Sequence, residues 1–385
     1  MDSLVINDSV EKKIGIIINN NAHIFSNGLI QNAYYLYQCL EKCGHICEFL
    51  CYDINPTPFQ HKQIPLKTIS EDSSIFSPLE YKAIITVSTG VNKNIYESMK
   101  KHKVAIIGFV CGCTMMMDQE YFLHINASKN FINKNAKVDE IWIIPSHKYM
   151  LDYIEIIRNA PSFIVPHLWS PECIQETFKL DYKKEESLLF YNIKKRKNKK
   201  INIIILESNM YIVKTAWIPI VIAEKLHQRY PDLIDTVYVF GYPEHKNADD
   251  MIASLSISSK VRKFKRLAIP NIIDHFNNNS NSFPVYLSTQ LYNSLNYTYY
   301  EILYYGYPLI HNSLDLDDQG YYYPEYDISK AVDCIIKACK YHDKNIDLIK
   351  EKAKKYLERV DPLNDDVCKI VNGMITSAIV NANKD

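Results

Sequence analysis

The chain has 385 residues, which is too long for one ordinary hydrophobic core and suits two domains. Lys plus Arg and Asp plus Glu both number 44, so the formal net charge is zero. That balance argues against nucleic acid as a partner, because proteins that bind it usually carry a basic surplus. The first residues are polar, and no apolar run reaches the roughly 18 residues of a membrane helix. We therefore expect a soluble, cytoplasmic protein without a membrane span.

The ten cysteines do not form an obvious metal-binding framework. Four of them, Cys39, Cys43, Cys47 and Cys51, recur every four residues, but the first two fall in an expected helix and the other two in the strand after it. A CxC pair stands apart at Cys111 and Cys113. These positions give no single ligand cluster, so we expect reduced, mostly buried thiols and no metal.

Short apolar runs alternate with helical patterns through the first half of the chain. The expected strands cover 14–18, 45–52, 83–87, 104–110, 140–144 and 163–165. The expected helices cover 29–43, 92–101 and 147–158, and Gly44 follows the first of them as a stop signal. Strands that alternate with helices indicate an α/β domain whose parallel sheet is covered on both faces.

The second half repeats this pattern after a charged stretch at 180–200. Strands are expected at 201–206, 237–240, 285–288 and 308–311, and helices at 218–230 and 299–305. The tail from 331 to 383 has helical composition. We expect an N-terminal domain at 1–170, a C-terminal domain at 171–345 and a helical tail at 346–385.

The turn after the first strand, SNGL at 26–29, is suited to bind an anion. Ser26 or Asn27 can cap the helix that follows, and Gly28 lets a ligand approach the backbone closely. A helix N-terminus offers free N–H groups to a phosphate. The GxGxxG dinucleotide fingerprint is absent, so we place Asn27 and Gly28 among the candidate donor-binding residues on this argument alone.

Three segments follow one another in a diagnostic order: PHLWSP at 166–171, VKTAWIP at 213–219 and YYEILYYGYPLIHNS at 299–313. In order and spacing they resemble the GT-B glycosyltransferases, especially the retaining family-4-like enzymes. The resemblance implies two Rossmann-like parallel-sheet domains that face each other across a cleft. The N-terminal domain would bind the acceptor, the C-terminal domain would bind the nucleotide sugar, and the C-terminal helices would pack across the hinge.

The same resemblance assigns residues. Lys214 corresponds to the basic residue that binds the donor diphosphate, and Glu301 to the second Glu of the E-x7-E motif, which contacts the donor nucleotide. Asn293, eight residues before Glu301, stands where those enzymes usually have the first Glu. Gly306 matches the motif glycine. These correspondences make Lys214, Glu301 and Asn293 the candidate catalytic residues.

Three further positions are candidate donor-pocket residues. His167 follows the last strand of the first domain, where a structural role is equally open, and His311 and Asn312 follow the strand after Gly306. The DLDD run at 315–318 contains paired aspartates of the kind that bind Mg²⁺ or Mn²⁺ in other glycosyltransferases. We interpret it as a solvated loop and expect no metal requirement.

The implied function is a hexosyltransferase-like glycosyltransferase that moves a sugar from a UDP- or GDP-linked donor to a glycan or another hydroxyl acceptor. It would use no cofactor beyond the donor. A catalytically silent protein of the same fold, which binds a nucleotide or sugar or acts as a scaffold, is the alternative that Asn293 keeps open. A sugar-nucleotide epimerase or a phosphorylase would share the fold. The sequence does not set the oligomeric state, the acceptor or the stereochemical outcome.

Overall fold

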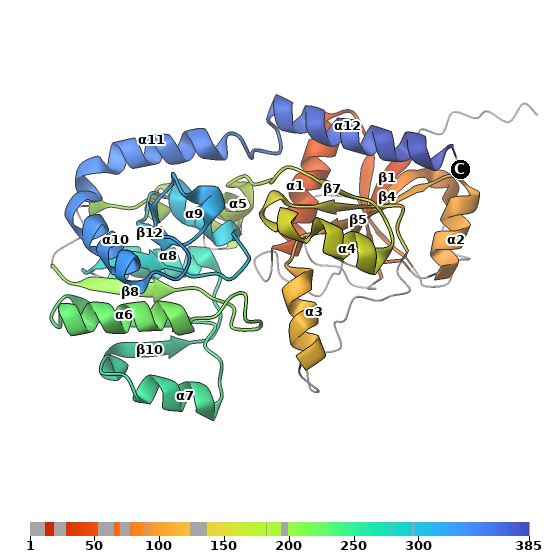
Figure 1. Ribbon diagram of the computed structural model, residues 1–385. Coiled ribbons are helices and arrows are strands. Elements are labelled where there is room, and N and C mark those ends of the chain that lie inside the picture. The colour runs from red at the N-terminus through yellow and green to blue at the C-terminus, as the bar shows by residue number, and fades with distance from the viewer. Residues whose placement is uncertain are drawn as a thin grey trace, which may run out of the picture. The chain divides into compact units, whose positions relative to one another are not determined.

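The computed structural model describes residues 12–18, 28–52, 65–69, 78–88, 90–91, 93–123, 137–181, 183–193, 199–279, 281–294 and 296–384. The chain divides into two compact units (Figure 1). The first contains Met1–Met115, Ser128–Ser170 and Val360–Asp385, and the second contains Met116–Ala127 and Pro171–Arg359. The chain thus returns to the first unit with its last residues.

A seven-stranded parallel sheet forms the first unit, in the order β3-β2-β1-β4-β5-β6-β7. Its strands are β1 (Lys13–Ile18), β2 (Cys47–Cys51), β3 (Leu66–Thr68), β4 (Tyr81–Val87), β5 (Ala105–Val110), β6 (Glu140–Ile143) and β7 (Ser162–Ile164). Its helices are α1 (Leu29–Lys42), α2 (Lys93–Lys101), α4 (Leu151–Arg158) and α12 (Asp365–Ala382). The division between the units falls inside α3 (Thr114–Leu123), after Met115.

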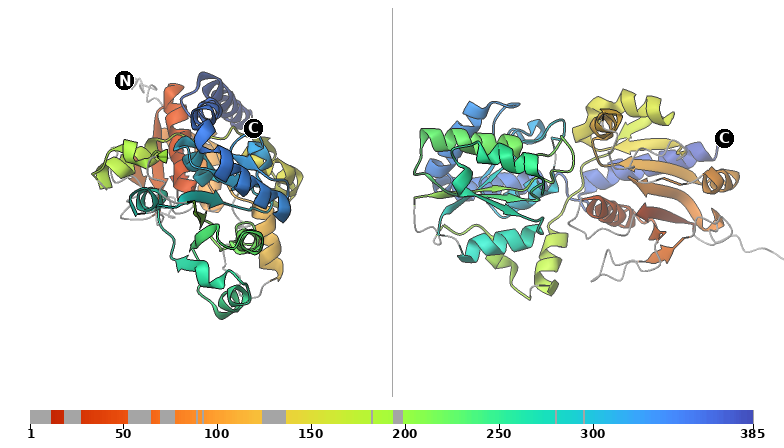
Figure 2. Two further views of the ribbon diagram at one scale, coloured as in Figure 1. Left: turned by 90° about the vertical axis from the view of Figure 1, so that its left-hand side faces the viewer. Right: turned by 90° about the horizontal axis from the view of Figure 1, so that it is seen from below.

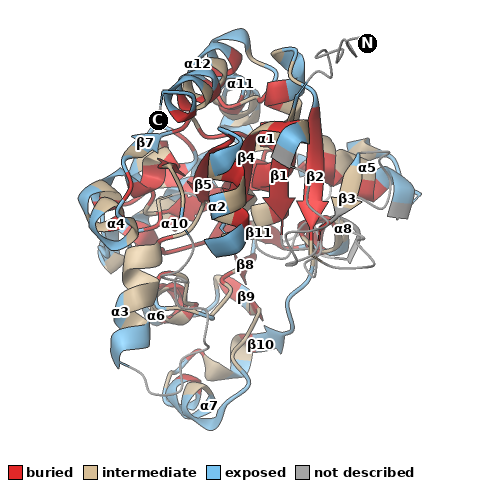
Figure 3. Cartoon of the chain, turned by 90° about the vertical axis from the view of Figure 1, so that its right-hand side faces the viewer, coloured by how far each residue is buried: buried red, intermediate tan, exposed pale blue. Residues whose placement is uncertain are grey.

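The central strands of this sheet are buried on both faces, as Figure 3 shows for β1, β2, β4 and β5. Continuous apolar sequence is what such a position requires. In the register, Ile16 of β1 lies between Phe49 of β2 and Ile85 of β4. The first and last helices of the unit, α1 and α12, pack against each other, and α12 also contacts β4 and β5.

The second unit contains a six-stranded parallel sheet in the order β10-β9-β8-β11-β12-β13. Its strands are β8 (Ile201–Ile205), β9 (Ile234–Phe240), β10 (Val261–Phe264), β11 (Phe283–Leu287), β12 (Leu309–His311) and β13 (Tyr321–Tyr322). Its helices are α5 (Glu172–Asp181), α6 (Trp217–Arg229), α7 (Lys246–Ala253), α8 (Ile269–Asn279), α9 (Tyr297–Tyr304), α10 (Ile328–Tyr341) and α11 (Ile346–Leu357). Helices cover both faces of this sheet (Figure 2), as in a doubly wound fold.

The expected α/β fold with two Rossmann-like sheets is confirmed. One helix differs: instead of a single helix from 147 to 158, a 3₁₀ helix at Pro145–Met150 precedes α4. His147 has non-helical backbone angles there, and this kink separates the two segments. The expected tail at 346–385 is shared between the units, with α11 in the second and α12 in the first. Over the described ranges, every helix is too short or too polar to span a membrane.

Candidate functional site

The strand order of the second unit creates a point where the sheet changes direction. From β8 the chain moves outward to β9 and β10, and it then returns to place β11 on the other side of β8. Open α/β sheets bind ligands outside the carboxyl ends of their strands at this switch point. Glu207 follows β8 and Ser288 follows β11, so both residues lie at that position.

Glu207 is a buried carboxylate at the switch point, with only 2% of its surface exposed. Ser288 Oγ donates a hydrogen bond to Oε1, and Gln290 Nε2 donates to Oε2 at 3.3 Å. Burial raises the pKa of Glu207 to about 7, while the Ser288 hydrogen bond and the Lys214 charge pull it downward. The site therefore contains a carboxyl group that titrates near neutrality, which is unusual outside functional sites.

Two cations accompany this carboxylate. Desolvation lowers the pKa of Lys214, attraction to Glu207 raises it, and repulsion from Arg266 lowers it. Arg266 lies in the exposed segment after β10, and desolvation of its guanidinium lowers its pKa as well. Lys214 and Arg266 thus repel each other at the carboxyl edge of the sheet, with Glu207 as a counter-charge. A bound anion would relieve that repulsion.

The loop that carries Lys214 is held by backbone contacts. Lys214 forms an isolated antiparallel bridge with Gln290. Asn209 sits inside the loop, where its Nδ2 donates to the carbonyls of Glu207 at 3.0 Å and Gly241 at 2.9 Å, and its Oδ1 accepts from Ala216 N at 2.7 Å. Together these contacts preorganise the loop between β8 and α6.

A glycine after β9 lets the next turn approach this loop closely. Gly241 has a φ of 70°, and a Cβ atom there would lie 2.8 Å from the carbonyl oxygen of Glu207. No L side chain fits that contact without a backbone shift. Gly241 is therefore part of the support for Glu207.

Asn293 joins the cluster through an amide relay. Its Nδ2 donates to Oε1 of Gln290, whose Nε2 in turn donates to Glu207. Asn293 is buried, with 6% of its surface exposed. The Asn293 amide therefore orients Gln290 toward the Glu207 carboxylate on another loop.

Two tyrosines complete the polar cluster. The hydroxyl of Tyr299 on α9 lies 2.6 Å from Ser288 Oγ, and the hydroxyl of Tyr323 donates to Ser288 O at 3.0 Å. Tyr323 also shares a hydrogen bond with Thr289 Oγ1. Each buried hydroxyl in this cluster has a partner, which makes the geometry rigid.

His311 and Asn312 hold the loops beside the cluster. The ring of His311 is buried, with Nδ1 accepting from Ser313 N at 3.1 Å and Nε2 3.0 Å from Gln319 O. These contacts assign the neutral tautomer that donates from Nε2, and burial lowers the pKa of His311 to about 4. Asn312 Oδ1 accepts from Gln290 N, and its Nδ2 donates to Gln290 O, both at 2.9 Å. Both side chains contact the protein backbone, and donor binding by either stays a prediction.

The remaining motif residues lie on helix α9 and directly after it. Residues two apart on a helix point about 200° apart, so Glu301 does not share the direction of Tyr299. Glu301 is buried and its charge acts on Tyr305. Gly306 ends α9 at the opposite edge of the sheet, where a Cβ atom would lie 2.6 Å from Lys350 Cε. Gln290 therefore links Lys214 and Asn293 in one cluster, while Gly306 lies at the other end of α9, and donor binding by Glu301 stays a prediction.

The candidates of the first unit form a separate group. Asn27 lies outside the described residues, and Gly28 starts α1 with a φ of 75° and no side-chain cap. His167 is 8% exposed, and burial together with the nearby His147 lowers its pKa to about 3. Within the part of the chain that the structure describes, Nε2 of His167 has no hydrogen-bond partner. A neutral imidazole nitrogen is thus available there for a ligand or a water molecule.

Two residues of the DLDD run accept hydrogen bonds, one through its carboxylate and one through its backbone carbonyl. Asp315 accepts a hydrogen bond from Ser294 Oγ, and Asp318 accepts one from Lys352 through its carbonyl. Among the described residues they do not gather with a third His, Cys, Asp or Glu as a metal site would require. The absence of a metal requirement remains a proposal.

A hollow of about 620 Å³ opens beside the ends of β9 and β10. It is lined by Tyr242, Glu244, His245, Lys246, Asp249, Lys263, Phe264 and Lys265. Its cations are balanced by acids: Lys263 pairs with Asp249, and Lys246 pairs with Asp250. The hollow therefore offers aromatic surface beside two ion pairs.

Sequence reasoning found Lys214 and Asn293 but missed Glu207, Arg266, Ser288 and Gln290. A signal was present, because the segments LES and STQ place polar residues directly after buried strands. No comparable sequence signal distinguished Arg266 from the other basic residues of its segment. Only the strand order brings the three segments to one edge.

Comparison with solved structures defines the class of fold. An α-glucosyltransferase bound to UDP and a 13-mer DNA containing an HMU base superposes with a TM-score of 0.58 at 13% identity, covering 96% of this chain and 99% of that one. A glycosyltransferase from Rickettsia africae gives 0.55 at 11% identity, covering 97% and 100%. HepE from Anabaena, solved with UDP and glucose, gives 0.55 at 11% identity, covering 94% and 99%. The fold is that of the GT-B glycosyltransferases.

The sequence itself belongs to a family defined by its own model. Residues 13–374 match the model described as "Protein of unknown function (DUF2827)", and the chain is a member of that family. A search of curated proteins found no significant match.

Proposed function

We propose that this protein is a metal-independent glycosyltransferase whose second unit binds the diphosphate of a nucleotide-sugar donor with Lys214 and Arg266. The observation that carries the proposal is the position of Lys214, which is bridged to Gln290 beside the buried Glu207 at the switch point of a GT-B sheet, with the positive charge of Arg266 acting on it. A diphosphate supplies the negative charge that this arrangement lacks.

The chemistry follows from where charge develops. As the bond between the anomeric carbon and the diphosphate oxygen breaks, that oxygen gains negative charge. Preorganised cations in a partly desolvated site stabilise such charge more than water does. Lys214 and Arg266 would supply it directly, and Glu207 is a positioning residue that attracts Lys214 and is itself oriented by Ser288 and Gln290.

The finer assignments extend this proposal. The donor is a UDP- or GDP-linked hexose, and the acceptor is a glycan or another hydroxyl compound. Glu301 contacts the donor nucleotide, as the motif resemblance implies. His167 offers its available Nε2 to a polar group of a substrate.

A panel of nucleotides and nucleotide sugars tests the proposal. At a ligand concentration of 100 times Kd, binding to the native state adds about 2.7 kcal/mol to stability, so one nucleotide should raise the unfolding temperature. The same donor should be hydrolysed slowly in the absence of an acceptor. Lys214→Ala should abolish both effects. Lys225→Ala should not, because Lys225 is exposed on α6 and bonds to Ser329.

The outcomes separate enzyme from binding protein. A nucleotide that stabilises the wild type without turnover of any donor, with or without added glycans, would favour the silent binding protein instead. A protein that no nucleotide stabilises, or a Lys214→Ala variant that binds like the wild type, would refute the proposed site.

A further inference from the structure

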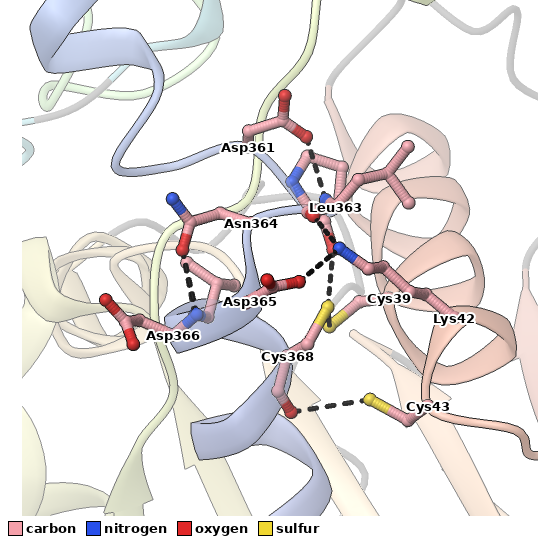
Figure 4. A network of polar contacts seen from close by, with 11 residues as sticks. Cys39, Lys42, Cys43, Asp361, Leu363, Asn364, Asp365, Asp366 and Cys368 are labelled. Atoms are coloured by element: carbon pink, nitrogen blue, oxygen red, sulfur yellow. Dashed lines mark hydrogen bonds and ion pairs between the residues drawn. The ribbon is translucent and has the colours of Figure 1, made fainter.

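Two cysteines at the C-terminal end of α1 meet a third cysteine from the distant C-terminal helix α12 in the first unit, outside the proposed donor site. Cys39 lies in the last turns of α1, Cys43 caps its C-terminal end, and Cys368 lies in the first turn of α12. Their three Sγ atoms lie within 4.8 Å of one another (Figure 4). The i, i+4 spacing of Cys39 and Cys43 puts both thiols on one face of α1, and α12 brings the third to that face.

We propose that Cys39, Cys43 and Cys368 form a thiolate site for Zn²⁺ that fastens the C-terminal helix α12 to α1. Two sulfurs bound to one tetrahedral Zn²⁺ at about 2.3 Å each lie about 3.8 Å apart. The distance from Cys39 Sγ to Cys368 Sγ is 3.8 Å. Three protein ligands leave the fourth tetrahedral position to water, which differs from the closed four-ligand sites of most structural zinc ions.

The segment that carries Cys368 is held in place by contacts with α1. Lys42 forms an ion pair with Asp365 at 2.6 Å and also donates to Leu363 O. Asn364 caps α12 by accepting from Asp366 N at 2.9 Å. The site therefore does not depend on a mobile ligand.

The surrounding charges suit a cation with three thiolates. Such a complex has a net charge of −1, and the Lys42 ammonium next to Cys43 acts against that charge. The C-terminal end of α1 favours a cation, and the N-terminal end of α12 favours the Cys368 thiolate.

A disulfide is the competing use of these residues. It would join Cys39 to Cys368 by shortening the sulfur separation to about 2.05 Å and would leave Cys43 without a role. The half-buried Cys43 therefore distinguishes the two uses, since only a metal site needs it.

Cobalt titration of the reduced full-length protein provides the test. One equivalent of Co²⁺ should produce thiolate-to-metal charge-transfer absorption, and Zn²⁺ should displace it and raise the unfolding temperature. Loss of partners that only orient a ligand costs 10–100-fold in affinity, so Cys43→Ser should weaken binding by more than about 100-fold. Cys39→Ser and Cys368→Ser should act similarly. Cys334→Ser, a half-buried thiol on α10, should leave binding unchanged.

Several results would overturn the site. One is the absence of charge-transfer absorption in the wild-type protein. Another is absorption that survives in the Cys43→Ser variant. This substitution exposes little core, so circular dichroism should show an intact fold. A Cys39–Cys368 disulfide in protein whose thiols were blocked at lysis would assign the pair to redox chemistry and would also overturn it.

Discussion

Replacing Glu207 with Gln should change how the stability of the second unit depends on pH. Burial, opposed by the Ser288 hydrogen bond and Lys214, raises the pKa of Glu207 from 4.5 to about 7. In the unfolded chain the carboxyl group ionises near its ordinary value. Between these pH values the unfolded state has lost a proton that the folded state keeps, so the stability falls as pH rises and the loss is complete above about pH 7.

The size of this loss follows from the same values. The difference between 4.5 and about 7, at about 1.36 kcal/mol per pKa unit, corresponds to about 3 kcal/mol. Glu207→Gln removes the titration. It also brings an amide opposite the Gln290 donor, which costs about 1–3 kcal/mol at every pH. The informative quantity is therefore the change in unfolding free energy between pH 5 and pH 8, not its value at one pH.

Urea unfolding at pH 5 and pH 8, followed by circular dichroism, measures that change. The variant should lose about 2.5 kcal/mol less than the wild type over this interval, because part of the full loss has already occurred at pH 5. Glu224→Gln is the matched control and should keep the wild-type change between pH 5 and pH 8, because hydrogen bonds from Ser256 and Ile257 outweigh desolvation and lower the pKa of Glu224, so that its titration falls mainly below this interval. The stabilising contribution of ionised Glu224 should be present above the ordinary pKa of a glutamate and should be lost as the pH falls and the carboxylate is protonated. Identical pH slopes for wild type and Glu207→Gln would refute the reasoning.

Three further outcomes follow from the site. Arg266→Ala should weaken nucleotide binding and reduce its salt dependence, measured by calorimetry at two ionic strengths, and unchanged affinity would remove Arg266 from the site. Glu301→Ala should chiefly raise the donor KM in steady-state kinetics, whereas a fall in kcat alone would contradict nucleotide binding. Gly241→Ala should lower the unfolding free energy by about 1–3 kcal/mol, because its φ of 70° and the 2.8 Å approach to Glu207 O exclude a Cβ atom; a neutral effect in urea unfolding would show that the turn can shift.

Much of the fold could be predicted from the sequence because its determinants are local. The run at Ile14–Ile18 is apolar throughout and the run at Ile201–Ile205 is interrupted only by Asn202, as is typical of strands buried on both faces, and each became a central strand. Gly44 and Gly306 mark helix ends with positive φ, a conformation that glycine adopts at little cost. The sequence pattern predicted one helix from 147 to 158 and missed the 3₁₀ helix at Pro145–Met150 that precedes α4. The kink at His147 that separates the two depends on the packing around it.

The composition of the sites depends on tertiary structure. Lys214 was identified by its motif, but Glu207, Arg266 and Gln290 come from the ends of three different strands, and the order β10-β9-β8-β11 alone puts those ends on one edge. Asn293 looked like a lost carboxylate until Gln290 connected it to Glu207. Cys39 and Cys368 are 329 positions apart, and they meet because α12 returns to pack on α1. Sequence periodicity indicates which face of a helix or strand is buried. Which elements become neighbours depends on the connections between strands, and these are not encoded in any local sequence pattern.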